Sequence, residues 1–209
     1  MDKERGKTLR RPRADAARNR MRVLEAAKAV FSTGGPQASL EAVAREAGVG
    51  IGTLYRHFPT RESLFEAVYR REVEQLVELA GQLSACPDPV AALRRWLRSN
   101  VEFVATKKGM SAALALATYG STDLSAYTAE QLTGAVRRLM DRIAAARGLR
   151  GDIGPEDVLH LMVALCYRSD AAGWQANVLR LLDVFVDGLQ VTREPPSSSR
   201  RRAPAVPGA

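Results

Sequence analysis

Apolar residues recur at intervals of three and four along most of this chain, and this period restricts its fold more than any other feature. Val23, Ala26, Ala27, Val30 and Phe31 form one such series, which would place all of them on one face of a helix. β-Branched residues nowhere alternate with polar ones for long, whereas Ala, Leu, Arg and Glu dominate throughout. The sequence therefore predicts an all-α fold.

Capping residues, glycines and prolines divide this pattern into about nine helices. Ser39 and Thr60 each precede a run of helix-forming residues, so their hydroxyls are predicted N-caps. Gly48 and Pro59 end the second and third of these runs. The predicted helices cover residues 15–32, 40–47, 51–58, 61–83, 89–104, 107–117, 123–147, 154–170 and 174–191.

Positive charge is concentrated at the two ends of the chain. The 209 residues carry a formal net charge of +8, of which residues 1–22 supply +6 and residues 193–209 supply +3. Residues 23–192 therefore carry −1, and the predicted folded part is nearly neutral. Basic ends of this kind suit an anionic partner such as nucleic acid, although they can also be solubilising segments.

Three other classes of protein are disfavoured. Cys86 and Cys166 lie far apart without metal-ligand spacing, so we expect reduced thiols, no disulfide, no metal and no cofactor. Residues 109–122 form the longest charge-free run, which is shorter than the roughly 18 apolar residues that cross a bilayer. We therefore expect a cytoplasmic protein without a membrane partner. Because the only histidines are His57 and His160 and no glycine-rich phosphate loop is present, we expect no enzymatic activity.

Residues 40–58 have the outline of a helix-turn-helix. Gly48 lies between the two short predicted helices, where it can adopt the positive φ that the turn needs. Ala44 is small enough for the helices to cross closely. The apolar residues predicted to pack these helices together are Val43, Ala47, Val49, Leu54 and Phe58.

The stretch LEAVAREAGVGIGTLYRHFPTRESLFEAV, residues 40–68, resembles the DNA-binding segment of TetR-type transcriptional regulators. The family pattern includes Gly-Thr-Leu-Tyr-x-His-Phe, which residues 52–58 reproduce, and the match is dense over residues 23–68. Beyond residue 69 the resemblance is only in helix number and length. It implies a helix-turn-helix domain followed by a dimeric, ligand-responsive domain, and most members of the family repress transcription until a small molecule releases them.

This resemblance divides the chain into four parts. Residues 1–14 are a basic flexible arm, 15–60 the helix-turn-helix domain, 61–192 the helical effector-binding and dimerisation domain, and 193–209 a disordered tail. The expected partners are double-stranded DNA, a second copy of the chain and an unidentified small-molecule effector. A DNA-binding activator or an architectural protein without an effector is the alternative.

The resemblance also implies the residues that contact DNA. Thr53 corresponds to a contact with base or phosphate, and Tyr55 and His57 to phosphate contacts. Gly50 stands where the family often has a polar residue, and it can touch a base only through its backbone. Ordinary solvent exposure is the alternative for the polar side chains, and packing is the alternative for Tyr55. The predicted DNA-binding residues are Ser39, Arg45, Gly50, Gly52, Thr53, Tyr55, Arg56, His57 and Arg61.

The last two predicted helices carry more apolar surface than one chain of this size is expected to cover. We therefore expect them to pack on a second copy as a two-fold four-helix interface, with an ordinary monomeric core as the alternative. The predicted interface residues are Val158, Met162, Leu165, Val178, Leu182, Phe185 and Leu189.

An effector cavity is expected among the middle helices. Aromatic and thioether side chains there are candidates for its wall, although core packing is the alternative for each of them. The candidates are Trp96, Phe103, Met110, Tyr119, Tyr127, Met140, Tyr167 and Trp174.

Overall fold

A computed structural model of the chain describes residues 10–34, 38–118, 122–168 and 173–190. These residues contain eight α-helices and no strand, so the predicted all-α fold is confirmed. The helices are α1 (Arg10–Gly34), α2 (Leu40–Glu46), α3 (Ile51–His57), α4 (Arg61–Leu83), α5 (Pro89–Thr118), α6 (Thr122–Arg147), α7 (Pro155–Tyr167) and α8 (Trp174–Gly188).

The helices differ from the predicted ones by more than three residues in two places, the middle of α5 and the start of α1. Residues 89–118 form the single helix α5, where the sequence predicted two helices with a break before Lys107. No glycine or proline stands between Val104 and Lys107, so nothing in the sequence ends the helix there, and Gly109 is accommodated inside α5 at a cost of only about 1 kcal/mol. Helix α1 begins at Arg10 and so includes the last five residues of the predicted arm, whereas residues 1–9 and the predicted tail lie outside the described residues.

The predicted caps are present at the helix starts. The Ser39 hydroxyl accepts a hydrogen bond from the Ala42 amide at 3.1 Å. Thr60 and Ser63 form a reciprocal capping box, in which each backbone amide donates to the other side chain at 3.1 and 3.2 Å. The carboxylate of Asp88 accepts two amides at the start of α5, at 2.9 and 3.2 Å. Local side chains therefore fix where three of the helices begin.

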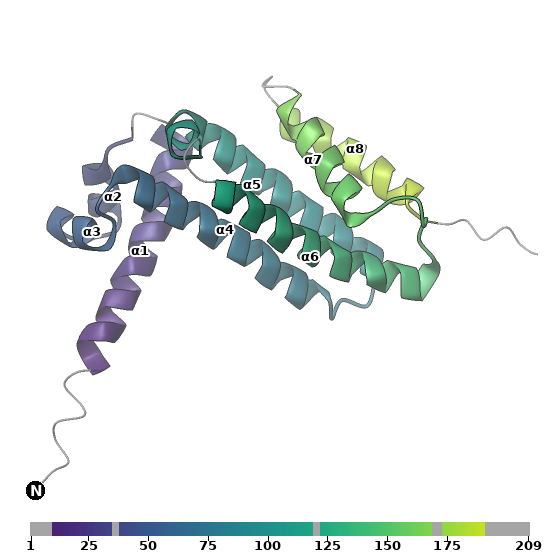
Figure 1. Cartoon of the computed structure of the whole chain (residues 1–209), viewed down its shortest axis with the longest axis horizontal. Coiled ribbons are helices and arrows are strands. Elements are labelled where there is room, and N and C mark those ends of the chain that lie inside the picture. Colours follow the sequence, from purple (N-terminus) through teal and green to yellow (C-terminus); the bar gives the residue numbers. More distant parts are fainter. Residues whose placement is uncertain (1–9, 35–37, 119–121, 169–172, 191–209) are drawn as a thin grey trace, which may run out of the picture.

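Helices α1, α2 and α3 form a head at one end of the molecule (Figure 1). Helix α4 runs from this head into a body formed with α5 and α6, and α7 and α8 lie together on the side of α5 away from α4. The turn between α2 and α3 is made by Gly48, which has the expected positive φ of +61°. The apolar residues predicted to hold the two short helices, such as Val43, Leu54 and Phe58, are buried.

Helix α1 belongs both to the head and to its joint with the body. Its buried residues Val23 and Ala27 lie in the common core, and the Phe31 ring stacks on Phe65 of α4 with centroids 4.2 Å apart. One turn before Phe31, the Lys28 ammonium of α1 lies 2.7 Å from the Glu72 carboxylate of α4. Contacts from α1 extend to both α4 and α5, so the position of the head is set by this one helix.

The body is held together by buried apolar residues and a few directed polar contacts. Trp96 of α5 is fully buried and donates from its indole Nε1 to the Leu76 carbonyl of α4 at 2.9 Å. Arg94 of α5 donates to the carboxylate and the carbonyl of Asp183 in α8, at 2.8 and 3.0 Å. None of the described helices is both long and apolar enough to cross a membrane.

We predict that Gly48→Ala lowers the free energy of unfolding by about 1–2 kcal/mol, because an L side chain is strained at positive φ. The added Cβ would also lie 2.6 Å from an Arg22 guanidinium nitrogen. Urea unfolding followed by circular dichroism measures this change. As a control, Gly134→Ala in α6 meets nothing within 4 Å and should be neutral or slightly stabilising. Equal stability of both variants would contradict the role assigned to the turn.

Candidate nucleic-acid interface

Helix α3 has one face in the core of the head and one face in solvent. Leu54 is fully buried and Phe58, directly after the helix, is 2% exposed. On the opposite face Ile51 is 39% exposed and Tyr55 is 45% exposed. Ile51 and Tyr55 are four residues apart and so lie on the same outer face of α3, which the head leaves open to a partner.

The start of α3 has two positions without a side chain, Gly50 and Gly52, on either side of the exposed Ile51. Gly50 is its N-cap and makes no side-chain cap bond, and Gly52 is in its first turn. A Cβ at either glycine would meet nothing within 4 Å, so neither glycine is required by packing inside the head. The backbone at the start of α3 can therefore be approached closely from outside.

Most of the predicted DNA-binding side chains lie around this first turn or on the same head. Tyr55 and Arg56 are exposed, and Thr53 and His57 are half-buried. The Arg56 guanidinium donates from Nε to the Gly52 carbonyl at 3.1 Å, which holds it along the helix. On α2, Arg45 is exposed, and Ser39 is exposed while its hydroxyl caps the helix. Their contacts with DNA stay predictions.

Arg61 has a role inside the head that the sequence did not predict. Its guanidinium lies over the rings of Phe31 and Phe65, at 5.3 and 5.2 Å from their centroids. It also donates a hydrogen bond to the Ala38 carbonyl before α2. Arg61 therefore connects the starts of α2 and α4 to α1, and any contact with DNA would be in addition to this packing role.

Two arginines of α1 lie beside α3, although neither is among the predicted DNA-binding residues. The Arg20 guanidinium lies 5.1 Å from the centroid of Phe58, and an Arg22 Nη is 3.4 Å from the Gly48 carbonyl. Both side chains are exposed. The helix predicted over residues 15–32 is confirmed, and it holds these two charges at defined places next to α3, which only the packing of α1 on the head shows.

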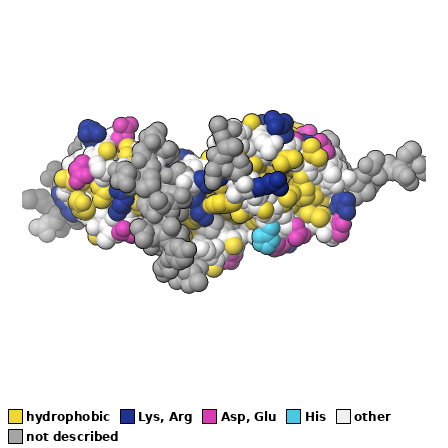
Figure 2. Space-filling view, turned by 90° about the horizontal axis from the view of Figure 1, so that it is seen from above, with side chains coloured by type: hydrophobic (Ala, Val, Ile, Leu, Met, Phe, Trp, Pro, Cys, Tyr) yellow, Lys and Arg dark blue, Asp and Glu magenta, His cyan; other side chains and the backbone are white. Residues whose placement is uncertain are grey.

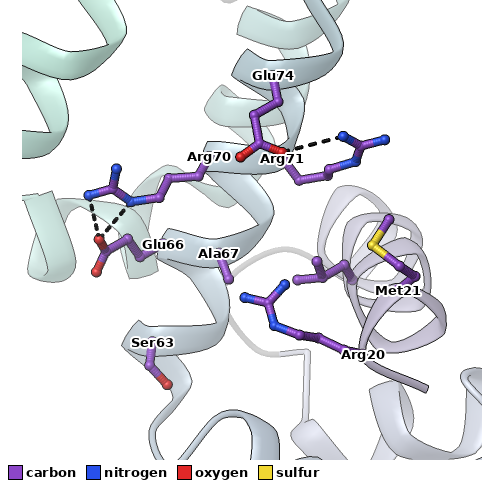
Figure 3. A pocket seen from close by; sticks show the side chains of 9 residues that line it. Arg20, Met21, Ser63, Glu66, Ala67, Arg70, Arg71 and Glu74 are labelled. Carbon is purple, nitrogen blue, oxygen red and sulfur yellow. Dashed lines mark hydrogen bonds and ion pairs between the residues drawn. The ribbon is translucent and has the colours of Figure 1, made fainter. Parts of the chain in front are cut away.

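A cleft of about 370 Å³ separates α1 from α4 next to these arginines (Figure 3). Its α4 side carries the ion pairs of Arg70 with Glu66 at 3.0 Å and of Arg71 with Glu74 at 3.3 Å. Both pairs join residues of α4 to one another. The cleft is therefore cationic at its α1 side through Arg20, and its α4 side is largely neutralised by internal pairing (Figure 3).

The predicted effector residues do not form one wall. Trp96, Phe103 and Met140 are buried, and Phe103 packs on Tyr69 with ring centroids 5.2 Å apart. Tyr127 is half-buried beside the Arg70 guanidinium, which lies 5.0 Å from its ring. The side chains of Met110 and Tyr119 lie outside the described residues.

Two of the predicted effector residues do come together around a lysine. The Lys108 ammonium lies 4.5 Å from the Trp174 ring and 5.7 Å from the Tyr167 ring. It also donates to the Cys166 carbonyl at 3.0 Å. Burial raises the pKa of the Cys166 thiol to about 11, so this cysteine is a protonated, unreactive neighbour.

The residues predicted for a dimer interface are mostly buried within the single chain. Val158, Met162, Val178, Leu182 and Leu189 are each at most 3% exposed, because their stripe faces the body of the same chain. This corrects their assignment to a partner-facing surface. Leu165 and Phe185 are half-buried and keep part of their surface in solvent.

Other apolar residues of α7 and α8 are left exposed. A field of hydrophobic side chains covers this part of the surface (Figure 2). We call it the α7/α8 face; its exposed members are Val163 at 43%, Tyr167 at 48%, Leu181 at 44% and Val184 at 70%.

Two family models match the chain. Residues 23–68 match bacterial regulatory proteins of the tetR family, and residues 88–191 match the C-terminal domain of SbtR-like transcriptional regulators. Among curated proteins, an HTH-type transcriptional regulator from Staphylococcus aureus strain USA300 is 40% identical over 63 residues. That match covers 30% of this chain and only about a third, 34%, of the length of the relative.

Solved structures match over most of the chain. The TetR transcriptional regulator SCO0520 from Streptomyces coelicolor is 41% identical with a TM-score of 0.74, covering 83% of this chain and 99% of that one. A TetR transcription regulatory protein from Mycobacterium vanbaalenii is 35% identical with a TM-score of 0.68, covering 86% and 99%. LfrR from Mycobacterium smegmatis, solved in complex with proflavine, is 22% identical with a TM-score of 0.59, covering 84% and 98%, and shares the fold.

We predict that Arg61→Ala lowers the free energy of unfolding by about 1–3 kcal/mol, because it removes a stacked guanidinium and leaves the Ala38 carbonyl without this donor. Arg61→Lys should also destabilise, since an ammonium cannot reproduce the planar stacking. Urea unfolding provides the measurement. Arg45→Ala, which removes an exposed charge from the same head, should stay within about 0.5 kcal/mol of wild type. A wild-type unfolding curve for Arg61→Ala would remove the packing role.

Proposed function

Because this chain belongs to the TetR family of bacterial transcriptional regulators, we propose that it is a homodimeric repressor that a small molecule releases from a palindromic operator. The family makes the chain a DNA-binding transcriptional regulator and not an enzyme. We propose four further properties: that the chain represses transcription, forms a homodimer, binds a palindromic operator and responds to a small-molecule effector.

The open glycine positions at the start of α3, Gly50 and Gly52, are the observation that carries the operator proposal. A helix enters the major groove with its amino-terminal residues toward the base edges. Gly50 and Gly52 let the backbone of α3 come close to the groove wall, and Thr53 adds a hydroxyl one residue further on. Tyr55 and His57 then donate to phosphates, which sets the register without reading sequence.

Basic side chains around α3 supply the remaining phosphate contacts. Arg45 and Arg56 lie on the exposed surface of α2 and α3, and Arg20 and Arg22 approach from α1. Residues 1–22 carry a net charge of +6. Neutralising phosphates with these charges releases counterions, so DNA affinity should fall steeply with salt.

The α7/α8 face supports the homodimer. Four large apolar side chains are exposed there on two neighbouring helices, and Leu165 and Phe185 are only half-buried. Two copies related by a two-fold axis would cover this face with itself and form a four-helix interface. The same axis would present two α3 helices to half-sites about 34–36 Å apart.

The effector is expected in the body, next to the α7/α8 face. Lys108, Tyr167 and Trp174 bring a cation and two rings together at the junction of α5, α7 and α8. A ligand bound there would contact the helices that carry the dimer face as well as α5, which also contacts α1. Such a ligand could therefore change the relation between the two heads.

The operator proposal is tested by selecting bound duplexes from a random pool. We expect an enriched palindrome with two half-sites about one helical turn apart, as a two-fold protein requires. Enrichment of a single asymmetric site would contradict the dimeric reading mode, and retention of no duplex in low-salt buffer would contradict DNA binding by this head.

We predict that Gly52→Ala separates stability from DNA binding. Alanine in an open helical position should stabilise the head by about 0.5–1 kcal/mol, whereas its methyl group should hold α3 away from the groove and weaken operator affinity about tenfold. Fluorescence anisotropy with a labelled operator measures affinity, and urea unfolding measures stability.

Gly81→Ala in α4 is the matched control, because its Cβ also meets nothing within 4 Å and it lies outside the head. It should gain similar stability and keep wild-type affinity. If Gly52→Ala bound the operator as tightly as wild type, the first turn of α3 would not be in close contact with DNA.

We predict that Val184→Arg converts the dimer to a monomer without unfolding the chain. Val184 is 70% exposed in the single chain, so a long charged side chain fits there, but it would place charge at the centre of the two-fold interface. Sedimentation velocity measures the change. Ala145→Arg, at an exposed position of α6, should leave the assembly unchanged. A dimeric Val184→Arg would exclude this face as the interface.

A further inference from the structure

A second groove lies where α1, α4 and α5 meet, and it shares no lining residue with the cleft between α1 and α4. Its volume of about 360 Å³ falls within the roughly 300–1,000 Å³ of known small-molecule sites. Charged, apolar and neutral polar side chains all contribute to it. They are Lys28, Glu72, Gln75, Leu76, Leu79, Ser99, Glu102, Phe103 and Thr106.

The deepest charge in this groove is a carboxylate. The Glu72 side chain is only 10% exposed, and a carboxylate at that depth needs a cationic partner. Its partner is the Lys28 ammonium at 2.7 Å, whose side chain is 38% exposed. Glu102 is exposed at the edge and adds a second negative charge, so the groove carries a net charge of −1.

One side of the groove is apolar. Leu76 and Phe103 are 5% and 7% exposed, and Leu79 is half-buried beside them. Each of these side chains keeps some surface toward the groove that another apolar group could cover. A carboxylate next to such a surface is complementary to a molecule with a cationic end and an apolar body.

We propose that this groove binds a small organic cation whose ammonium group pairs with Glu72 and whose apolar body covers Leu76, Leu79 and Phe103. The Lys28 ammonium marks the place of the ligand cation, because it is already a protonated amine at hydrogen-bond distance from Glu72. The Lys28 side chain is 38% exposed, so its ammonium can move into solvent while a ligand amine takes its place and keeps the Glu72 carboxylate paired.

The neighbouring cleft between α1 and α4 does not have this character. Three arginines, Arg20, Arg70 and Arg71, face two carboxylates there, Glu66 and Glu74 (Figure 3). Both carboxylates are paired with arginines of α4. An organic cation should therefore bind more tightly in the Glu72 groove than in this cleft, although the two have similar volumes.

Binding would act on the joint between head and body. The Lys28 to Glu72 pair connects α1 to α4, and replacing Lys28 frees α1 from this tie while the stacked pair of Phe31 and Phe65 remains. The cation should then weaken operator binding, and the operator should weaken cation binding by the same factor. This consequence rests on the proposed function, whereas the site itself rests on the groove alone.

Isothermal titration of the full chain with phenethylammonium at pH 7 tests the site. We expect saturable binding, and binding of the neutral isostere 2-phenylethanol that is at least about tenfold weaker, because it lacks the charge-assisted hydrogen bond. Equal affinity for the two compounds, or no saturable heat with phenethylammonium, would overturn the proposal.

Three variants make the test specific to Glu72. Glu72→Gln should weaken phenethylammonium binding at least about tenfold, whereas Glu66→Gln, which removes a carboxylate from the neighbouring cleft, should not. Lys28→Met should strengthen binding, since it removes the competing ammonium and keeps an apolar stem. A purely structural ion pair would not give this opposite response, so unchanged or weaker binding by folded Lys28→Met would overturn the proposal. Circular dichroism checks that each variant is folded.

Fluorescence anisotropy with the labelled operator then tests whether cation binding is coupled to operator binding. If phenethylammonium binds but leaves operator affinity unchanged, the coupling through Lys28 is wrong. If the protein without the cation binds no duplex, the proposed function is wrong. The calorimetric titration still tests cation binding in the groove, because it does not depend on DNA.

Discussion

The packing of α1 onto α4 is the interaction on which the rest of the structure depends. The apolar face of α1 closes the core of the head through Val23 and Ala27, and its far end joins the body through the stacked rings of Phe31 and Phe65. One helix thus supplies both the inside of the head and its attachment. The direction in which α3 faces is fixed by the same contacts, because α2 and α3 have few others.

In this arrangement the outer face of α3 is not needed to hold the head together. Leu54 and Phe58 make the inward contacts, and Arg61 adds the stacking and the hydrogen bond that hold the starts of α2 and α4. Gly50, Gly52 and Tyr55 then have no packing task in the head. Packing within the head does not require glycine or tyrosine at these positions. Contact with a partner would require them, and in this family the partner is DNA.

Local signals were predictable from the sequence, and contacts between distant segments were not. The caps Ser39 and Thr60 and the turn at Gly48 depend on neighbours within a few residues, and all three are present. The break expected before Lys107 was wrong, because no glycine or proline stands between Val104 and Lys107 to end the helix. The stripe through Val158 and Val178 correctly indicated a buried face, but a period cannot tell whether the same chain or a second copy covers it. The stacking of Arg61 likewise needs three segments brought together by the fold.

The unbroken length of α5 has a mechanical consequence. Arg94 near its start holds α8, and Phe103, nine residues later, lies at the groove shared with the head. At about 1.5 Å per residue these points are roughly 14 Å apart along a rod without a hinge. A shift of α8 at Arg94 would therefore be carried along α5 toward the groove beside the head. Helix α8 and the groove beside the head are thus coupled through one continuous stretch of α5.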